Sequence, residues 1–353
     1  MNKIKALALG ITLLALSPSQ SPAASLLFEG FESYVSGTTV ALDATSPGPN
    51  AGPNGGPGTA WWSLNSPSFF VVNAETYTIP NVITNFVSPH GGTNMVRGHP
   101  PNGGFFDTIY YNIAYRLNNT NGFSGNVQLD WWFYDPLGTN ASANHYRDNI
   151  SLISYLNVPT DTDYFGAPDD PGFPAERLSL GADSIERPGY KSTNYQAQIL
   201  NPGSTAGSYD VANGWFNLTN KIRSVGWHHA RIAVSPVNTN NSFAPVAFYI
   251  DNMVVPALTN TTEVTNNFNI VEMDADYDFY TGYFDDISFG SLPPPTVSIA
   301  AAAGKAVVTW PGAGFTLQTS TNLAGSNFVD VLTATSPYTN TITSTPLFFR
   351  LRQ

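Results

Sequence analysis

Short segments in which apolar and polar residues alternate constrain this chain more than any other feature. Segment 127–135 places an apolar residue at every second position, and segments 227–234 and 283–289 alternate or nearly do so. A period of two residues is that of a β-strand with one buried face. No long segment shows the 3.6-residue apolar period of a helix, and Gly, Pro and Asn clusters separate the alternating runs. The chain is therefore predicted to be all-β.

We expect roughly a dozen strands before residue 291, a number that suits one large two-sheet sandwich. The expected strands cover residues 26–34, 69–74, 93–98, 106–117, 127–135, 149–156, 177–181, 195–200, 215–218, 227–234, 246–251, 270–279 and 282–289. A short turn of helix is expected at 221–225.

The first 24 residues have the pattern of a secretory signal peptide. Lys3 and Lys5 precede a short apolar run at 6–16, and the small residues at 21–23 offer a cleavage site. Neither this run nor any later stretch reaches the roughly 20 apolar residues of a membrane-spanning helix. We expect an exported bacterial protein without a transmembrane segment, either secreted or held at the cell surface.

The charge balance limits the partners of this chain. It has 14 basic and 25 acidic residues, a net charge of −11, which becomes −13 without the two lysines of the leader. Such a balance disfavours nucleic acid and anionic lipid and favours neutral glycans, cations or basic surfaces. Because the chain has no cysteine, an exported form must be stabilised by core burial or a bound ion rather than by disulfides.

A proline-rich stretch at 292–296 divides the chain. Three consecutive prolines favour an extended spacer, so we expect a main domain at 25–291 and a small module at 297–353. Leu317-Gln318-Thr319-Ser320-Thr321-Asn322-Leu323 and Phe348-Phe349-Arg350-Leu351 resemble a fibronectin-III-like module found at the C-terminus of many secreted bacterial proteins.

Three segments of the main domain resemble the closing strands of a concanavalin A-like, laminin-G-type jelly roll. They are Trp227-His228-His229, Tyr249-Ile250-Asp251 and Phe284-Asp285-Asp286-Ile287-Ser288-Phe289. The resemblance covers roughly residues 25–291. It implies a two-sheet jelly-roll sandwich, here followed by a small β-sandwich module, and a fold that mostly handles sugars.

The polar face of segment 127–135 is the strongest functional indication. An aromatic ring can cover the apolar C–H face of a pyranose, while amides and carboxylates bond its hydroxyls. Neighbouring strands divide their residues in the same way. If these strands adjoin, one concave face displays Gln128, Asp130, Trp132, Tyr134, Gln196, Gln198, His229, Arg231, Tyr249 and Asp251.

A structural interpretation of this face stays open. A loop can cover the aromatic residues, and Arg231 can serve only to neutralise Asp130 or Glu272. We expect His228, which points away from His229, to be a packed core histidine. Trp61-Trp62, just after the Gly- and Pro-rich loop, can form a loop-borne aromatic site, but we expect a large core anchor there.

Glu272-Met273-Asp274-Ala275-Asp276 resembles the Glu-x-Asp-x-Glu strand of retaining glucanases. The resemblance implies Glu272 as nucleophile, Asp274 as the tuning residue and Asp276 as acid/base. The chain departs from that pattern in having Asp276 where the family has Glu, and in carrying the motif late in the domain. Calcium binding and a solvated acidic strand are the alternatives.

Calcium is the one cofactor that the sequence suggests. Glu29 and Glu32 at the first strand, and Asp285 and Asp286 on the last, supply the hard oxygen ligands that Ca²⁺ takes. The jelly-roll resemblance implies a structural calcium between these strands. A second acidic cluster is Asp161, Asp163, Asp169 and Asp170.

We therefore predict a secreted, non-catalytic carbohydrate-binding or adhesion-type protein, with a polysaccharide or surface glycan as its partner. One alternative is a glycan-cleaving enzyme, a retaining glycoside hydrolase before a polysaccharide lyase, although Arg231, Gln196, His229 and Tyr249 are residue types that lyases use. Another is a purely structural surface or matrix protein. The sequence contains no nucleophile elbow, zinc-protease motif, phosphate loop or dinucleotide fingerprint.

Overall fold

The structure is a computed structural model. It describes residues 25–37, 61–62, 69–79, 83–98, 107–113, 117, 119, 122–140, 147–155, 174–182, 189–200, 214–237, 243–261, 267–276, 282–292, 297–302, 304–310, 316–322, 327–332, 334–343 and 345–352. The expected signal peptide, most of the linker and the second acidic cluster (161–170) lie outside the described residues.

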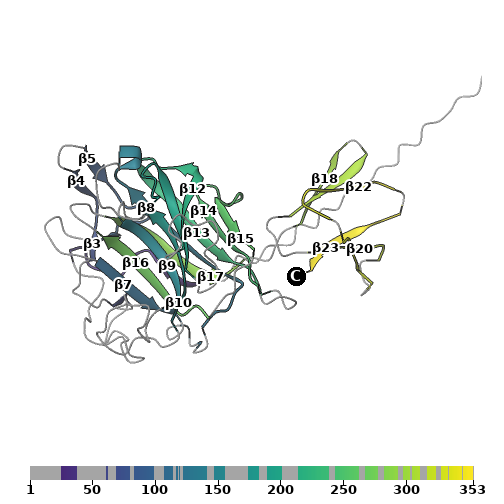
Figure 1. The fold of residues 1–353 in the computed structure, drawn as a ribbon, viewed down its shortest axis with the longest axis horizontal. Coiled ribbons are helices and arrows are strands. Elements are labelled where there is room, and N and C mark those ends of the chain that lie inside the picture. Colours follow the sequence, from purple (N-terminus) through teal and green to yellow (C-terminus); the bar gives the residue numbers. More distant parts are fainter. Residues whose placement is uncertain are drawn as a thin grey trace, which may run out of the picture.

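The main part of the chain is a sandwich of two antiparallel sheets, so the predicted all-β fold class is confirmed (Figure 1). The first sheet, sheet A, has eight strands. Its order is β15 (Leu258–Asn260), β14 (Val246–Ile250), β13 (Gly226–Val234), β8 (Val127–Asp135), β17 (Tyr283–Ser291), β6 (Met95–Arg97) and β3 (Phe70–Val72), and β1 (Ser25–Glu29) also pairs with β17.

Sheet B has seven strands. Its order is β12 (Trp215–Ile222), β11 (Asn194–Leu200), β10 (Pro174–Ala182), β9 (Arg147–Tyr155), β16 (Ile270–Asp276), β7 (Asp107–Asn112) and β2 (Trp61–Trp62). Neighbours in space are often far apart in sequence, as β9 and β16 are. This arrangement brings side chains from four distant regions onto one face.

One core fills the space between the sheets, because the alternating strands of both turn their apolar residues inward. Trp131 and Phe133 of β8, and Leu152 and Leu180 of sheet B, belong to this core and are at most 1% exposed. Trp61 belongs to it as well, which confirms its predicted place as a core anchor. The opposite faces of the two sheets therefore carry the polar residues, on opposite sides of the sandwich.

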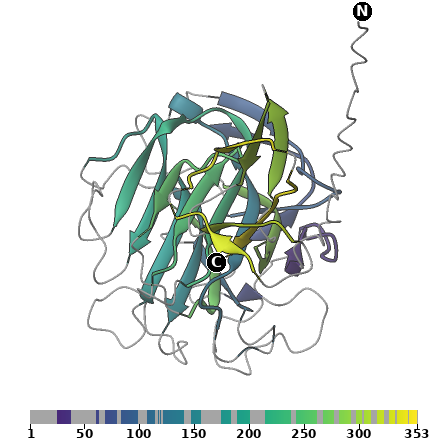
Figure 2. The ribbon, with the colours of Figure 1, turned by 90° about the vertical axis from the view of Figure 1, so that its right-hand side faces the viewer.

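A small unit follows the sandwich in the chain, and in Figure 2 its yellow strands lie in front of the sandwich. It has one sheet ordered β18 (Ser298–Ala302), β19 (Lys305–Thr309) and β22 (Tyr338–Thr341), and a second ordered β21 (Val329–Asp330), β20 (Thr316–Ser320) and β23 (Phe348–Arg352). Val308, Trp310 and Leu317 form its core.

Two local predictions fail. The helical turn expected at 221–225 is wrong, because β12 continues as a strand to Ile222. The pairing of β4 (Glu75–Ile79) with β5 (Ile83–Val87) was not predicted, although both segments are rich in β-branched and aromatic residues. A 3₁₀ turn, η1, covers Gly138–Asn140. Within the described part of the chain, no helix has the length and apolar character to cross a membrane.

Candidate functional site

The ten residues predicted to share one face lie on two. Gln128, Asp130, Trp132, Tyr134, His229, Arg231, Tyr249 and Asp251 belong to sheet A or its margin, whereas Gln196 and Gln198 lie on β11 of sheet B. Placing the two glutamines with the others was wrong. Alternation reveals which residues of one strand share a face, but not the sheet to which the strand belongs.

On sheet A, the predicted aromatic platform is already covered from within the protein. The imidazole of His90 stacks on Trp132 with ring centroids 3.6 Å apart, and the imidazole of His229 stacks on it at 4.9 Å. Tyr134 is buried, with the edges of Trp227 and Tyr283 against it. This arrangement agrees with the structural interpretation of the face, in which a loop covers the aromatic residues.

The polar residues around Trp132 are likewise paired with each other. Asp130 Oδ1 accepts hydrogen bonds from Arg231 Nε at 2.7 Å and lies 3.1 Å from His229 Nε2. Asp251 turns away from this face: its carboxylate bonds the ring of His228 and the backbone N–H of His229. On this face of sheet A, the polar side chains around Trp132 are therefore bonded mainly to one another and not available to a ligand.

Three of the four predicted calcium ligands, Glu32, Asp285 and Asp286, contact the loop 88–94. Glu32 accepts bonds from the N–H groups of Thr93 and Asn94, and the Asn94 bond is the main reason that its pKa is lowered. Asp285 accepts the N–H of Gly91, and Asp286 pairs with His90 Nδ1 at 2.7 Å.

Glu29 makes its contacts on the other side, with Phe31 N–H and the Tyr34 hydroxyl. Each of the four carboxylates is thus paired with N–H or O–H groups of the protein. Among the described residues, no three His, Asp or Glu side chains are grouped as metal ligands, and calcium binding at these positions stays a prediction.

Sheet B carries a different feature on its outward face, a single row of residues in register across six strands. The cross-strand pairs join Tyr110 to Glu272, Glu272 to Ser151, Ser151 to Ser179, Ser179 to Gln198, and Gln198 to Trp215. At about 4.8 Å per strand, the row extends roughly 24 Å. It places an acid, two hydroxyls and an amide between two aromatic residues, and all six residues are buried, at 1–4% exposure.

The middle of this row is a hydrogen-bonded chain. The hydroxyls of Ser151 and Ser179 lie 2.7 Å apart, and Ser179 Oγ donates to Gln198 Oε1 at 2.9 Å. In the next row, Asp274 and Asn149 are cross-strand partners. Asn149 Nδ2 is buried and lacks a hydrogen-bond partner within the part of the chain that the structure describes.

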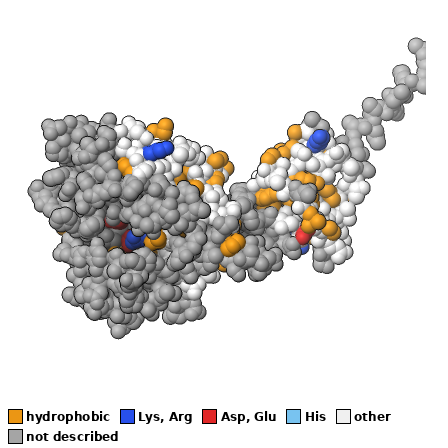
Figure 3. All heavy atoms as spheres, in the orientation of Figure 1, with side chains coloured by type: hydrophobic (Ala, Val, Ile, Leu, Met, Phe, Trp, Pro, Cys, Tyr) orange, Lys and Arg blue, Asp and Glu red, His pale blue; other side chains and the backbone are white. Residues whose placement is uncertain are grey.

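An ion pair crosses the row. Arg177 on β10 reaches past β9, and its Nη2 contacts both carboxylate oxygens of Glu272 on β16. The Glu272 side chain is 1% exposed and that of Arg177 is 25% exposed. Figure 3, in the orientation of Figure 1, shows a few acidic and basic side chains on this side of the sandwich. Of the two partners, Arg177 is the one that solvent reaches.

The predicted catalytic residues are only partly placed. Glu272 and Asp274 share the outward face of β16, as a period of two requires. Asp276 ends the same strand, but its side chain lies outside the described residues. Glu272, the expected nucleophile, is held by Arg177.

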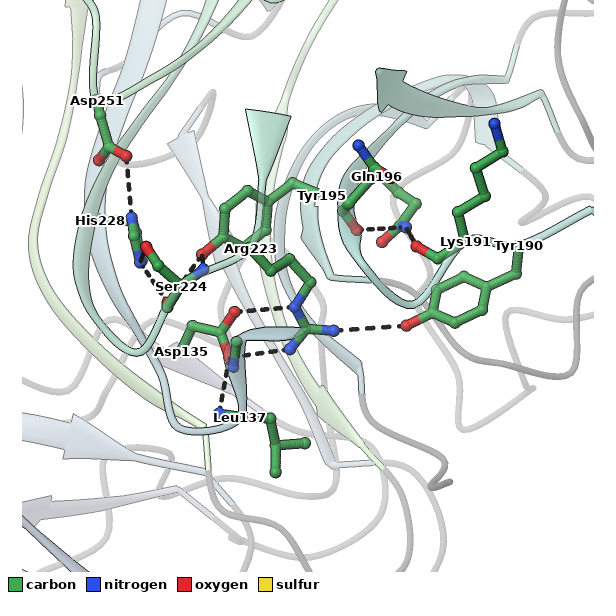
Figure 4. Close-up of polar contacts among 12 residues, drawn as sticks. Asp135, Leu137, Tyr190, Lys191, Tyr195, Gln196, Arg223, Ser224, His228 and Asp251 are labelled. Carbon is green, nitrogen blue, oxygen red and sulfur yellow. Dashed lines mark hydrogen bonds and ion pairs between the residues drawn. The ribbon is translucent and has the colours of Figure 1, made fainter. Parts of the chain in front are cut away.

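Sequence reasoning missed a polar cluster at one end of the sandwich (Figure 4). Arg223 and Asp135, both fully buried, form two hydrogen bonds of 2.8 and 2.9 Å. The Arg223 charge outweighs burial and lowers the pKa of Asp135, which also accepts the N–H groups of Leu137 and Gly138. This buried ion pair joins the end of β8 to the end of β12. No local sequence pattern predicts it, because the two residues are far apart in the chain.

The same cluster contains a Ser-His-Asp arrangement that is not a catalytic triad. His228 Nδ1 lies 3.0 Å from Asp251 Oδ2, and Nε2 lies 3.4 Å from Ser224 Oγ but 2.7 Å from the Ser224 carbonyl oxygen. A carbonyl only accepts, so Nε2 carries a hydrogen and cannot take a proton from the serine. His228 is 5% exposed, which confirms the predicted packed histidine.

No protein-family model matches the chain, and no curated protein matches it. Among solved structures it is similar to an endo-β-1,4-glucuronan lyase from the fungus Trichoderma reesei, at 11% identity and a TM-score of 0.34 over 62% of this chain and 87% of that one.

It is also similar to a PL-14 alginate lyase from Aplysia kurodai, at 10% identity and a TM-score of 0.37 over 62% and 87% of the two chains. A third likeness is to the exoplasmic/lumenal domain of VIP36 in a Ca²⁺/mannose-bound form. The identity is 12% and the TM-score 0.34, over 65% of this chain and 85% of that one. At identities and TM-scores this low, these likenesses decide neither ligand nor chemistry for this chain.

Proposed function

We propose that this protein binds a glycan on the outward face of sheet B, without cleaving it. The observation that carries the proposal is the part-exposed Arg177 above the buried register row from Tyr110 to Trp215, whose hydroxyl, amide and acidic groups lie between two aromatic residues. These are the groups that recognise sugar hydroxyls and ring faces. The net charge of −11 favours a neutral glycan.

Arg177 is the residue that we assign to direct contact with the glycan. Its guanidinium is part-exposed above a polar floor, and Glu272 holds it in place. A planar guanidinium can bond several acceptors at once in a fixed geometry, which suits contact with sugar hydroxyls.

Binding is favoured over hydrolysis by the state of Glu272. A retaining glycosidase needs a carboxylate free to attack, with a second carboxyl about 5–5.5 Å away. Here the Glu272 carboxylate is paired with Arg177 through both oxygens, so its role is to position the arginine.

The test compares two identical substitutions on opposite faces. Arg177→Lys keeps the positive charge beside Glu272 but loses the planar fork, and Arg231→Lys makes the same change beside Asp130 on sheet A. Binding of the mature protein and both variants is measured by affinity electrophoresis over neutral and acidic polysaccharides, with reducing ends assayed in parallel.

We expect Arg177→Lys to weaken binding at least tenfold and Arg231→Lys to leave it unchanged, with no new reducing ends. Loss of binding only in Arg231→Lys would move the site to sheet A. If the wild type releases reducing ends and Glu272→Gln does not, the protein is a hydrolase and the proposal of binding without cleavage is wrong. If no polysaccharide binds, the proposal is wrong and a structural role becomes the better account.

A further inference from the structure

β18 is an ordered strand that buries almost nothing within its own chain. All five of its residues are exposed, on both faces, whereas Val308 on the adjacent β19 is fully buried. A strand usually offsets its ordering entropy by burying one face. This strand has no such compensation in the single chain.

The outer edge of β18 is also open and unprotected. It pairs with β19 in unbroken register from Ser298 to Ala302, and among the described strands nothing pairs with its other edge. Edge strands are normally guarded by charged residues, proline or a bulge. β18 has the sequence Ser-Ile-Ala-Ala-Ala and contains none of these guards.

Two of the other outer strands of the module carry charged residues, and the third, β22, is uncharged but partly buries alternate residues. β23 carries Arg350 and Arg352, and β21 has only two residues, of which one is Asp330. Figure 3 shows a module surface with many hydrophobic side chains and few charged ones. β18 is therefore the outer strand of the module that is both uncharged and exposed along its whole length.

We infer that β18 pairs antiparallel with β18 of a second copy of this chain, joining two modules into one continuous sheet. A two-fold axis through Ala300 would set Ala300 against its counterpart, Ile299 against Ala301 and Ser298 against Ala302. In this register every cross-strand pair contains at least one alanine, and no charged side chains face each other. In an acidic protein, an uncharged strand is where two copies can approach without like charges facing each other.

The small size of the contact sets its strength. Five residue pairs bury far less than the roughly 1,200–2,000 Å² of a stable interface. The dimer is therefore weak and depends on concentration, as suits molecules crowded in a matrix or on a surface. This assembly does not depend on glycan binding by sheet B.

Sedimentation velocity of the mature protein over a wide concentration range tests the inference. Wild type is expected to shift reversibly from monomer toward dimer as concentration rises. Ala300→Lys places two like charges across the axis and should keep the protein monomeric. Thr339→Lys, an exposed change on β22 at the opposite edge of the same sheet, should associate as wild type does.

Hydrogen exchange supplies the second readout. Amides 298–302 should become more protected at high concentration in wild type and in Thr339→Lys, but not in Ala300→Lys. A wild type that stays monomeric throughout, or equal effects of the two lysine variants, would overturn the inference. Circular dichroism melting of each variant shows that the sandwich and module remain folded.

Discussion

Arg177 on β10 reaches across β9 to the buried carboxylate of Glu272 on β16. Burial makes the two partners unequal, because Glu272 is 1% exposed and Arg177 is 25% exposed. An arginine that loses its partner can still reach water, whereas a buried carboxylate cannot.

Removing the arginine should therefore cost more stability than removing the acid. We expect Arg177→Met to destabilise the fold by about 3–5 kcal/mol, because it leaves a buried charge unpaired. Glu272→Gln should cost about half of that or less. Urea unfolding of both variants and of the double variant measures this asymmetry, and equal losses would show that the pair is symmetrically solvated.

Trp132 should behave as a structural residue and not as a sugar platform. His90 and His229 stack on its indole, so Trp132→Ala is expected to cost about 3 kcal/mol while glycan affinity stays within twofold of wild type. Phe28→Ala is the control, because Phe28 is an exposed aromatic residue of the same sheet and should change stability by no more than about 0.5 kcal/mol. Lost affinity with normal stability in Trp132→Ala would favour a binding site on sheet A.

His228 should make stability depend on pH. Burial disfavours its charged form, but the Asp251 carboxylate and the Ser224 carbonyl outweigh burial and raise its pKa above the ordinary value. Because the folded state holds this proton more tightly, the stabilisation is complete below the unfolded pKa of about 6.5 and is lost as pH rises through the folded pKa.

Asp251→Asn isolates this effect. We expect the difference in urea midpoint between wild type and the variant to be largest near pH 6 and to shrink toward pH 9. A constant difference across that range would mean that His228 is neutral throughout. Asp251 itself has a lowered pKa, through its bonds to His228 acting against burial, so it stays ionised over the whole window.

Calcium binding by Glu29, Glu32, Asp285 and Asp286 stays a prediction from sequence, and the described contacts give a different expectation. Burial raises the pKa of Asp285 to about 7, and the Glu32 and Asp286 carboxylates are paired with groups of the loop 88–94. We expect the melting temperature at pH 8 to be equal in EDTA and in millimolar calcium. A calcium-dependent rise that is lost in Asp286→Asn would restore the sequence-based prediction.

Asp285 offers a matched measurement without calcium. A carboxyl with a raised folded pKa destabilises the fold once pH exceeds its unfolded value of about 3.9, and the penalty is complete above the folded value near 7. Asp285→Asn should therefore gain stability relative to wild type as pH rises from 4 to 7. No gain would indicate that Asp285 is ionised in the folded state.

The strands could be predicted from the sequence because their cause is local. Alternation in 127–135 fixes which side chains of β8 share a face, and the structure has that strand with the same bounds. The shared outward face of Glu272 and Asp274 follows from the same period. Pattern alone also predicted a packed His228 and a buried Trp61.

Only the tertiary structure decided which strands adjoin. The row from Tyr110 to Trp215 joins residues of six strands, between positions 110 and 272 of the chain, and no local pattern encodes that register. Gln198 was therefore grouped with Trp132, although a whole core separates their faces. Side-chain period is a property of a few consecutive residues, whereas sheet order is the outcome of burying every apolar face at once.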